Sequence, residues 1–212
     1  MSRIEYLLPE EIEKRSFEII SEELATRGIL LPPEEAMITK RVIHTSADFE
    51  YTQTLCYSEG AVDKLKKLIL NGANIVTDTN MALAGINKKM LARFGGEAYC
   101  FMADEEVSRL AKERGTTRAA VSMERAAKIK EPVIFAIGNA PTALLQLYQM
   151  IQEGRWKPAF VIGVPVGFVN VEAAKELIME TTVPYIVNRG RKGGSNVAAA
   201  ICNAVLYEVG KK

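Results

Sequence analysis

Five short runs of apolar, β-prone residues alternate with helical stretches, and this alternation limits the possible fold more than any other feature of the chain. The runs cover residues 74–77, 98–102, 133–137, 159–164 and 184–187. Their spacing leaves room for a helix between successive strands, which predicts crossover connections and parallel neighbours. We therefore predict an α/β fold: a three-layer α/β/α sandwich with a mainly parallel sheet of about five strands.

Each predicted strand ends in small or polar residues just before the next helix begins. These residues should share the carboxyl edge of the sheet, the edge at which the strands end, where open α/β proteins bind ligands. Thr79 and Asn80 follow the first run, and Asn139 follows the third. The sequence therefore predicts a ligand site lined by these side chains and by the loops beside them.

The final loop, residues 188–196, follows the last strand and combines cations with glycines. Arg189, Arg191 and Lys192 stand among three glycines, and Ser195 or Asn196 begins the next helix. Glycines let backbone amides approach a ligand, arginine pairs with carboxylate or phosphate, and a helix N-terminus adds positive potential. We interpret the final loop as an anion-binding site; the alternative is a glycine-rich turn with solvated cations.

His44 is the only histidine in the 212 residues and the default agent for proton chemistry near neutral pH. Arg41 lies three residues earlier, so the two side chains share one face if the segment is helical. Thr45, Ser46 and Asp48 follow where that helix should end. The competing interpretation is a half-buried histidine whose ring nitrogens bond to backbone groups.

Two further residues need a structural alternative beside the functional one. Ser16 lies in a predicted helix that starts near Pro9, where a serine commonly bonds to its own helix. Arg118 falls in the first turn of a helix capped by Thr116 or Thr117, where the helix dipole disfavours a cation. Arg118 is therefore either held there by a ligand or simply solvated.

Charge and cysteine content exclude several classes of partner. With 27 Lys plus Arg against 26 Asp plus Glu, the net charge of +1 gives no field that would attract nucleic acid or a membrane surface. The cysteines, at 56, 100 and 202, have no CxxC spacing and predict reduced thiols without a disulfide or zinc site. No signal peptide or apolar run of ~18 residues is apparent, so we expect a cytoplasmic protein. No linker divides residues 1–212, which predicts a single domain.

The inventory of reactive groups favours an isomerase or a lyase. The sequence contains no GxGxxG or GxxxxGK[ST] motif, no nucleophile elbow and no paired carboxylates at metal-ligand spacing. One proton donor, several arginines and amide-rich loops suit a reaction in which a large anionic substrate is held still and one proton is placed. We expect no metal site and no cofactor.

Six segments together resemble the precorrin-8X methylmutase family of corrin biosynthesis. They are KRSF at 14–17, KRVIHTSADFEY at 40–51, TDTNMALAGI at 77–86, AIGNAPTALLQL at 136–147, GVPVGFVNVEAAKE at 163–176 and NRGRKGGSNVAAAICNA at 188–204. The resemblance spans essentially the whole chain. It implies an α/β/α homodimer that moves a methyl group from C11 to C12 of precorrin-8 or its cobalt complex, giving hydrogenobyrinate or cobyrinate.

The resemblance also assigns roles to particular residues. The family's catalytic histidine matches His44, its substrate-contacting serine and arginine match Ser16 and Arg41, and a further active-site arginine matches Arg118. The HTSADFEY segment is more similar to the cobalt-precorrin branch than to the metal-free branch. Any cobalt would then belong to the substrate, and the expected partner is a small corrinoid.

Two other functions are compatible with these patterns. A non-catalytic tetrapyrrole carrier would bind precorrin and leave its absorption spectrum unconverted. A nucleotide-dependent α/β transferase would bind adenine cofactors, although the missing glycine fingerprint argues against this function.

Overall fold

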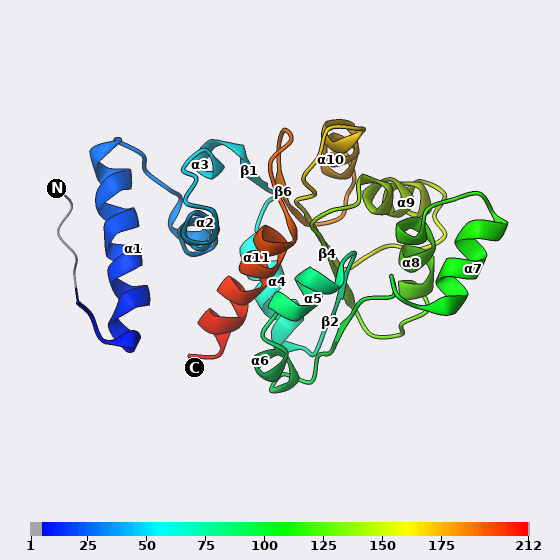
Figure 1. Cartoon of the computed structure of the whole chain (residues 1–212), viewed down its shortest axis with the longest axis horizontal. Helices are drawn as coiled ribbons and strands as arrows, with labels where there is room; N and C mark the ends of the chain where they lie inside the picture. The colour runs from blue at the N-terminus through cyan, green and yellow to red at the C-terminus, as the bar shows by residue number, and fades with distance from the viewer. Residues whose placement is uncertain (1–5, 212) are drawn as a thin grey trace.

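The computed structural model describes residues 6–211, apart from the side chain of residue 10, and is built around one six-stranded sheet (Figure 1). The strand order is β1-β6-β5-β4-β2-β3. The strands are β1 (Leu55–Tyr57), β2 (Asn74–Thr77), β3 (Ala98–Tyr99), β4 (Val133–Ile137), β5 (Phe160–Gly163) and β6 (Tyr185–Asn188). All neighbours pair in parallel except β1, which is antiparallel to β6.

Helices connect the strands and cover the sheet. They are α1 (Pro9–Thr26), α2 (Pro33–Ser46), α3 (Tyr51–Thr54), α4 (Ala61–Leu70), α5 (Asn80–Gly85), α6 (Lys88–Ala92), α7 (Glu105–Glu113), α8 (Arg118–Ala126), α9 (Pro141–Gln152), α10 (Val171–Met179) and α11 (Ser195–Val209). Thr117, one of the two predicted caps of α8, accepts a hydrogen bond from the amide of Ala120. Arg118 is therefore the first residue of its helix.

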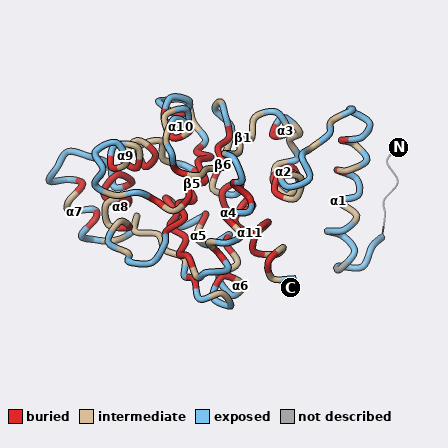
Figure 2. The backbone as a smooth tube through the Cα atoms, turned by 180° about the vertical axis from the view of Figure 1, so that it is seen from behind, coloured by how far each residue is buried: buried red, intermediate tan, exposed pale blue. Residues whose placement is uncertain are grey.

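The alternation of side chains along the central strands produces two cores. In β4, Ile134 and Ala136 pack into one buried cluster with α2, α4 and α11, whereas Val133, Phe135 and Ile137 pack into another with α8, α9 and α10. Successive side chains of a strand point to opposite faces, so each face has its own helix layer. The buried residues accordingly concentrate along the middle of the molecule (Figure 2). The three-layer α/β/α prediction is confirmed.

All five predicted runs contain strands, and the sheet has one more strand, β1, that was not predicted. This strand has only three residues and directly follows the single turn of α3. A segment so short carries no periodic signal, and its pairing with β6 exists only once the chain has folded. In addition, β3 spans two residues where residues 98–102 were expected to be extended.

The N-terminal helices lie at one end of the long axis of the molecule, and α7 and α8 lie at the other (Figure 1). Helix α1 packs on α2 through a small apolar cluster that contains Ile20, Leu24 and Ile43. Leu8, just before α1, is 58% exposed, and within α1 Ile12 is 53% and Ile19 is 44% exposed. This end of the chain therefore presents apolar side chains that nothing in the described chain covers.

Candidate functional site

Asp78 links two loops at the carboxyl edge of the sheet. It follows β2, is 1% exposed, and its carboxylate accepts hydrogen bonds from the backbone amides of Gly138, Asn139 and Ala140 at 2.9, 2.8 and 2.6 Å. Burial raises the pKa of Asp78, while the three amide donors oppose that rise. These amides lie where α9 begins, so the carboxylate occupies the end of a helix dipole that would otherwise attract an anion.

Thr79 and Ser195 meet beside this carboxylate. Their hydroxyl oxygens are 2.7 Å apart, and Thr79 also caps α5 by accepting from the amide of Ala82. The loop that carries Asn139 touches the same place, since a Cβ added at Gly138 would lie 2.7 Å from the Cα of Ser195. The structure therefore brings Thr79, Ser195 and the Asn139 loop together, as the sequence predicts. Asn80 lies beside them with an exposed side chain.

The cations of the final loop are paired with carboxylates. Arg189 pairs with Glu176 at 3.1 Å, and Arg191 with Glu172 at 2.9 Å. Lys192 donates to both Asp48 and Glu50 at 2.6 Å, which raises the pKa of Lys192 and lowers that of Asp48. All three cations are exposed, so an anionic ligand would have to compete with these carboxylates.

His44 stands in the last turn of α2 with an exposed side chain and stacks on Phe17 of α1. The two ring centroids are 5.3 Å apart and the ring planes differ by 23°. The guanidinium of Arg41 lies 4.7 Å from the centroid of the Phe17 ring and forms an ion pair with Glu13. The nearby Ser16 hydroxyl donates to the carbonyl of Ile12 at 2.9 Å. Ser16 is thus bonded to its own helix, as in the structural interpretation of this serine. Phe17 therefore contacts His44 and Arg41 and adjoins Ser16, which are three of the four residues that the family resemblance singles out.

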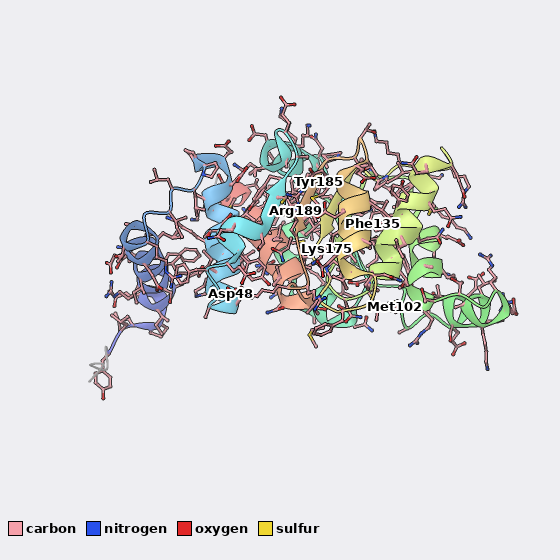
Figure 3. The ribbon with its side chains drawn as sticks, turned by 90° about the horizontal axis from the view of Figure 1, so that it is seen from above. Asp48, Met102, Phe135, Lys175, Tyr185 and Arg189 are labelled. Carbon is pink, nitrogen blue, oxygen red and sulfur yellow. The ribbon has the colours of Figure 1, made fainter. Side chains whose placement is uncertain are left out.

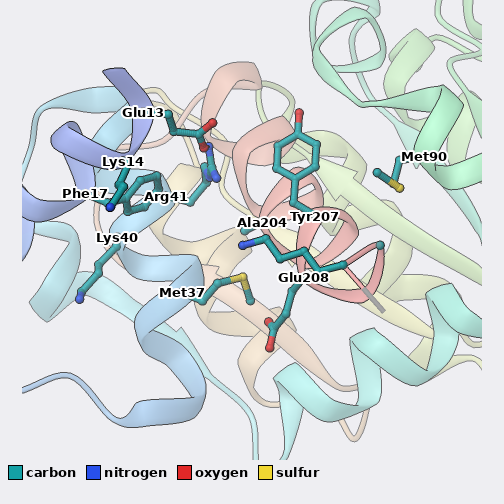
Figure 4. Close-up of a pocket in the computed structure, with 12 residues that line it drawn as sticks. Glu13, Lys14, Phe17, Met37, Lys40, Arg41, Met90, Ala204, Tyr207 and Glu208 are labelled. Atoms are coloured by element: carbon teal, nitrogen blue, oxygen red, sulfur yellow. The ribbon is translucent and has the colours of Figure 1, made fainter. Parts of the chain in front are cut away.

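A cavity of about 700 Å³ opens next to this cluster, between α1, α2 and the C-terminal half of α11 (Figure 4). Its lining residues are Glu13, Lys14, Phe17, Met37, Lys40, Arg41, Met90, Ala204, Tyr207, Glu208, Gly210 and Lys211. Apolar side chains are mixed with four cations, and the volume falls within the range of small-molecule sites. The sequence analysis did not anticipate this cavity, because its walls come from the two ends of the chain.

The cluster around His44 and the carboxyl edge are connected within one chain. Helix α2 ends at Ser46 and is followed by Ala47, whose φ is 54°; the next residue, Asp48, binds Lys192 of the final loop. The final loop in turn leads to Ser195 and its contact with Thr79. His44 therefore lies four residues before Asp48, which binds the final loop through Lys192.

Arg118, the first residue of α8, lies in the opposite half of the molecule from α2 and its residue His44 (Figure 1). Its guanidinium donates to the carbonyl of Met102 at 3.3 Å, and the neighbouring Thr117 bonds to Thr142 at the start of α9. Figure 3 labels Asp48, four residues after His44, and Met102, whose carbonyl binds Arg118, on opposite sides of the middle of the molecule. Within one chain, Arg118 joins the carboxyl edge but not the His44 cluster.

Among residues 6–211, no group of three or more His, Cys, Asp and Glu side chains is arranged to hold a metal ion. In the same part of the chain, no helix has the length and apolar character needed to cross a bilayer.

The three-layer fold, with polar loops gathered where parallel strands end, defines an α/β protein of the class that binds small molecules at that edge. A sequence model described as "CbiC: Precorrin-8X methylmutase" matches residues 11–208. The chain therefore belongs to the precorrin-8X methylmutase family. Methylmutases are isomerases that transfer a methyl group within one molecule, so the chain is an enzyme of this type with a role in cobalamin biosynthesis.

Individual relatives agree with this assignment. The chain is 45% identical over 197 residues to a cobalt-precorrin-8 methylmutase of Priestia megaterium, covering 93% of this chain and 87% of the relative. It is 44% identical over 206 residues to the enzyme of the same name from Salmonella typhimurium, covering 95% and 96%. The crystal structure of precorrin-8X methyl mutase from Thermus thermophilus aligns with a TM-score of 0.85 and 38% identity, covering 95% of this chain and 98% of that one.

Proposed function

We propose that the chain moves a methyl group from C11 to C12 of cobalt-precorrin-8 or precorrin-8, giving cobyrinate or hydrogenobyrinate. The observation that carries this proposal is the position of His44, stacked on a residue that lines a cation-bearing apolar cavity. A corrinoid has a broad apolar ring bordered by carboxylates, and such a cavity complements both features. Cobalt, where present, enters as part of the substrate, and the protein supplies no cofactor.

In the proposed mechanism, His44 donates a proton or a hydrogen bond to a ring nitrogen of the macrocycle. Electron density is drawn toward that nitrogen, and the methyl group migrates with its bonding electrons to the adjacent ring carbon. No external methyl donor or protein nucleophile is then required. The exposed ring of His44 is accessible to such a ligand, and a placed proton donor typically contributes ~10²- to 10⁴-fold to the rate.

The remaining site residues hold the substrate in this proposal. Arg41 is half-buried and paired with Glu13, so a substrate carboxylate would take the place of Glu13. The Ser16 hydroxyl can accept a hydrogen bond from the ligand while it donates to Ile12. Carboxylates of the ring bind the cations of the final loop and the hydroxyls of Thr79 and Ser195.

We further propose that the site is shared between two copies of the chain in a homodimer. Helix α2, which carries His44, and α8, which begins with Arg118, lie in opposite halves of the chain (Figure 1), so in this proposal a single ligand meets both residues because Arg118 comes from a second copy. The exposed apolar residues of α1, Ile12 and Ile19, provide a surface for such a contact. We place this homodimer in the cytoplasm, consistent with its free cysteines.

The test of the mechanism is His44→Ala, assayed by the absorbance change from substrate to product at saturating precorrin-8, with and without cobalt. We expect kcat to fall by about 10²-fold or more. Thr45→Ala, an exposed neighbour on the same helix, is the matched control and should keep the wild-type rate. An unchanged kcat in His44→Ala would remove this residue from the chemistry. A wild-type protein that binds the corrinoid without converting it would instead be a carrier.

The test of binding is Arg41→Ala and Arg118→Ala, each titrated with product corrinoid. Both should weaken binding about tenfold or more, as expected for one charge-assisted contact. Arg109→Ala is the control, because Arg109 is exposed and pairs only with Glu113 of its own helix among the described contacts. Unchanged affinity in folded variants would contradict the assigned roles.

A further inference from the structure

We propose that Lys175 is a positioning residue for the substrate: it fixes the backbone of the final loop from beneath, so that the side chains and amides of the loop face the ligand. This inference rests on the proposed function, since it concerns how the same site is held in shape. Lys175 lies within α10 and inside the 163–176 segment of the family resemblance, but the sequence assigned it no role of its own.

The contacts of Lys175 are all directed at the final loop. The side chain is 0% exposed, and its ammonium donates to the carbonyl of Gly190 at 2.7 Å and to that of Lys192 at 2.9 Å. Asn188, also 0% exposed, donates to the carbonyls of Arg189 and Lys192 at 3.1 and 2.8 Å. Two buried side chains thus bind three carbonyls of the loop on its inner side (Figure 3 labels Lys175 and Arg189).

Because these carbonyls point toward Lys175 and Asn188, the side chains and amides of the final loop are left to face the ligand. Gly190 has φ +72°, a conformation that glycine adopts without strain, which lets the chain reverse above the ammonium group. Farther along, the amide of Gly194 donates to the carbonyl of Val164, which holds the end of the loop against β5. The start of α11, with Ser195, then lies in a fixed position at the carboxyl edge.

Helix α10 holds the side chains of the loop as well as its backbone. Glu172 and Glu176 stand three residues before and one residue after Lys175, and they pair with Arg191 and Arg189. Residues three and four apart share a helix face, so this face of α10 carries the partners of both arginines. The ammonium group of Lys175 adds hydrogen bonds to two backbone carbonyls, that of Gly190 between the two arginines and that of Lys192 just after them.

Burying the ammonium group of Lys175 costs free energy. Burial lowers the pKa of Lys175 to about 8, because the charged form loses its hydration there. A methionine of similar length would fill the space without that cost. We infer that the ammonium group is kept because it binds the carbonyls of Gly190 and Lys192. Lys175 would then act on the substrate only through the final loop.

The test compares Lys175→Met with Ile178→Ala, a control on the same helix. Ile178 is 0% exposed in the core beneath the sheet, so its truncation should weaken the fold without touching the final loop. We expect Lys175→Met to raise KM for precorrin-8 about tenfold with kcat within threefold. Ile178→Ala should lower the melting temperature and leave KM at the wild-type value. Equal KM in Lys175→Met and wild type, or an equal rise in both variants, would overturn the proposal.

A second measurement needs no substrate and separates this inference from the proposed function. Amide hydrogen exchange at residues 189–194 should be faster in Lys175→Met than in wild type, and unchanged in Ile178→Ala. Lys175→Gln, which can still donate to one carbonyl, should give an intermediate exchange rate and serves if the methionine variant does not fold. Wild-type exchange in the folded variants would refute the role of Lys175 even if turnover were normal. Faster exchange in a chain that does not convert precorrin-8 would support the loop role and reject the proposed reaction.

Discussion

The contact between Asp78 and the loop after β4 allows a quantitative prediction of stability. One carboxylate oxygen accepts from Gly138, and the other accepts from both Asn139 and Ala140. The Gly138 contact is fully buried, whereas the other two are partly open to solvent. Removing the carboxylate therefore leaves one donor without any partner and two that can reach water.

We expect Asp78→Ala to lower the free energy of unfolding by about 3 kcal/mol. Three hydrogen bonds to a charged acceptor at about 1.5 kcal/mol each would give a larger loss. Relief from burying the carboxylate offsets part of it, as the raised pKa of Asp78 indicates. Asp78→Asn can keep its oxygen where two amides donate and should lose only about 2 kcal/mol, mostly from an amide group facing the Gly138 donor.

The assay is thermal and urea unfolding at pH 7 without ligand, followed by circular dichroism. In a chain of this length 1 kcal/mol corresponds to about 2–4 °C, so the expected drop in melting temperature is about 6–12 °C for Asp78→Ala. Asp63→Ala, at an exposed position in the first turn of α4, is the control and should lose about 0.5 kcal/mol. A loss below about 1 kcal/mol for Asp78→Ala, or a larger loss for Asp78→Asn, would refute the reasoning.

Two further predictions concern the final loop and its support. Gly193→Ala should destabilise the fold by about 3 kcal/mol or more, because its Cβ would lie 2.0 Å from the carbonyl oxygen of Val164. Gly190→Ala, with no atom near its added Cβ, should lose only about 1 kcal/mol, and equal losses in urea unfolding would contradict this difference. The pKa of Lys175 is lowered from 10.5 to about 8, so between these pH values the unfolded chain binds the extra proton and stability rises with pH. The unfolding free energy of wild type relative to Lys175→Met should therefore increase by at most about 3 kcal/mol from pH 8 to 10.5, and a constant difference would contradict the lowered pKa of Lys175.

Several features of the fold follow from local sequence. Continuous apolar runs such as 133–137 mark strands that are covered on both faces, and the polar residues after them mark the carboxyl edge. Thr117 as the cap of α8 and His44 at the end of α2 also follow from patterns within one turn of helix. These features are predictable because periodicity and capping act between neighbours in the chain.

The site depends on contacts between distant segments. Lys192 meets Asp48 across 144 positions of sequence, and Thr79 meets Ser195 across 116. The sequence indicated the cations of the final loop but not the carboxylates that hold them. Glu172 and Glu176, four residues apart, carried a weak signal of a shared helix face.

By itself, the sequence determined the layered α/β architecture, the polar carboxyl edge and, through its motifs, the family. Only the tertiary structure decided that β1 joins the sheet, that Asp78 binds backbone amides, and that Lys175 is buried under the final loop. It also placed α8, which begins with Arg118, in the opposite half of the molecule from α2, which carries His44. The reason is that side-chain patterns fix which face of an element is buried, whereas partners across the sheet are fixed by strand order and loop geometry, which no local pattern records.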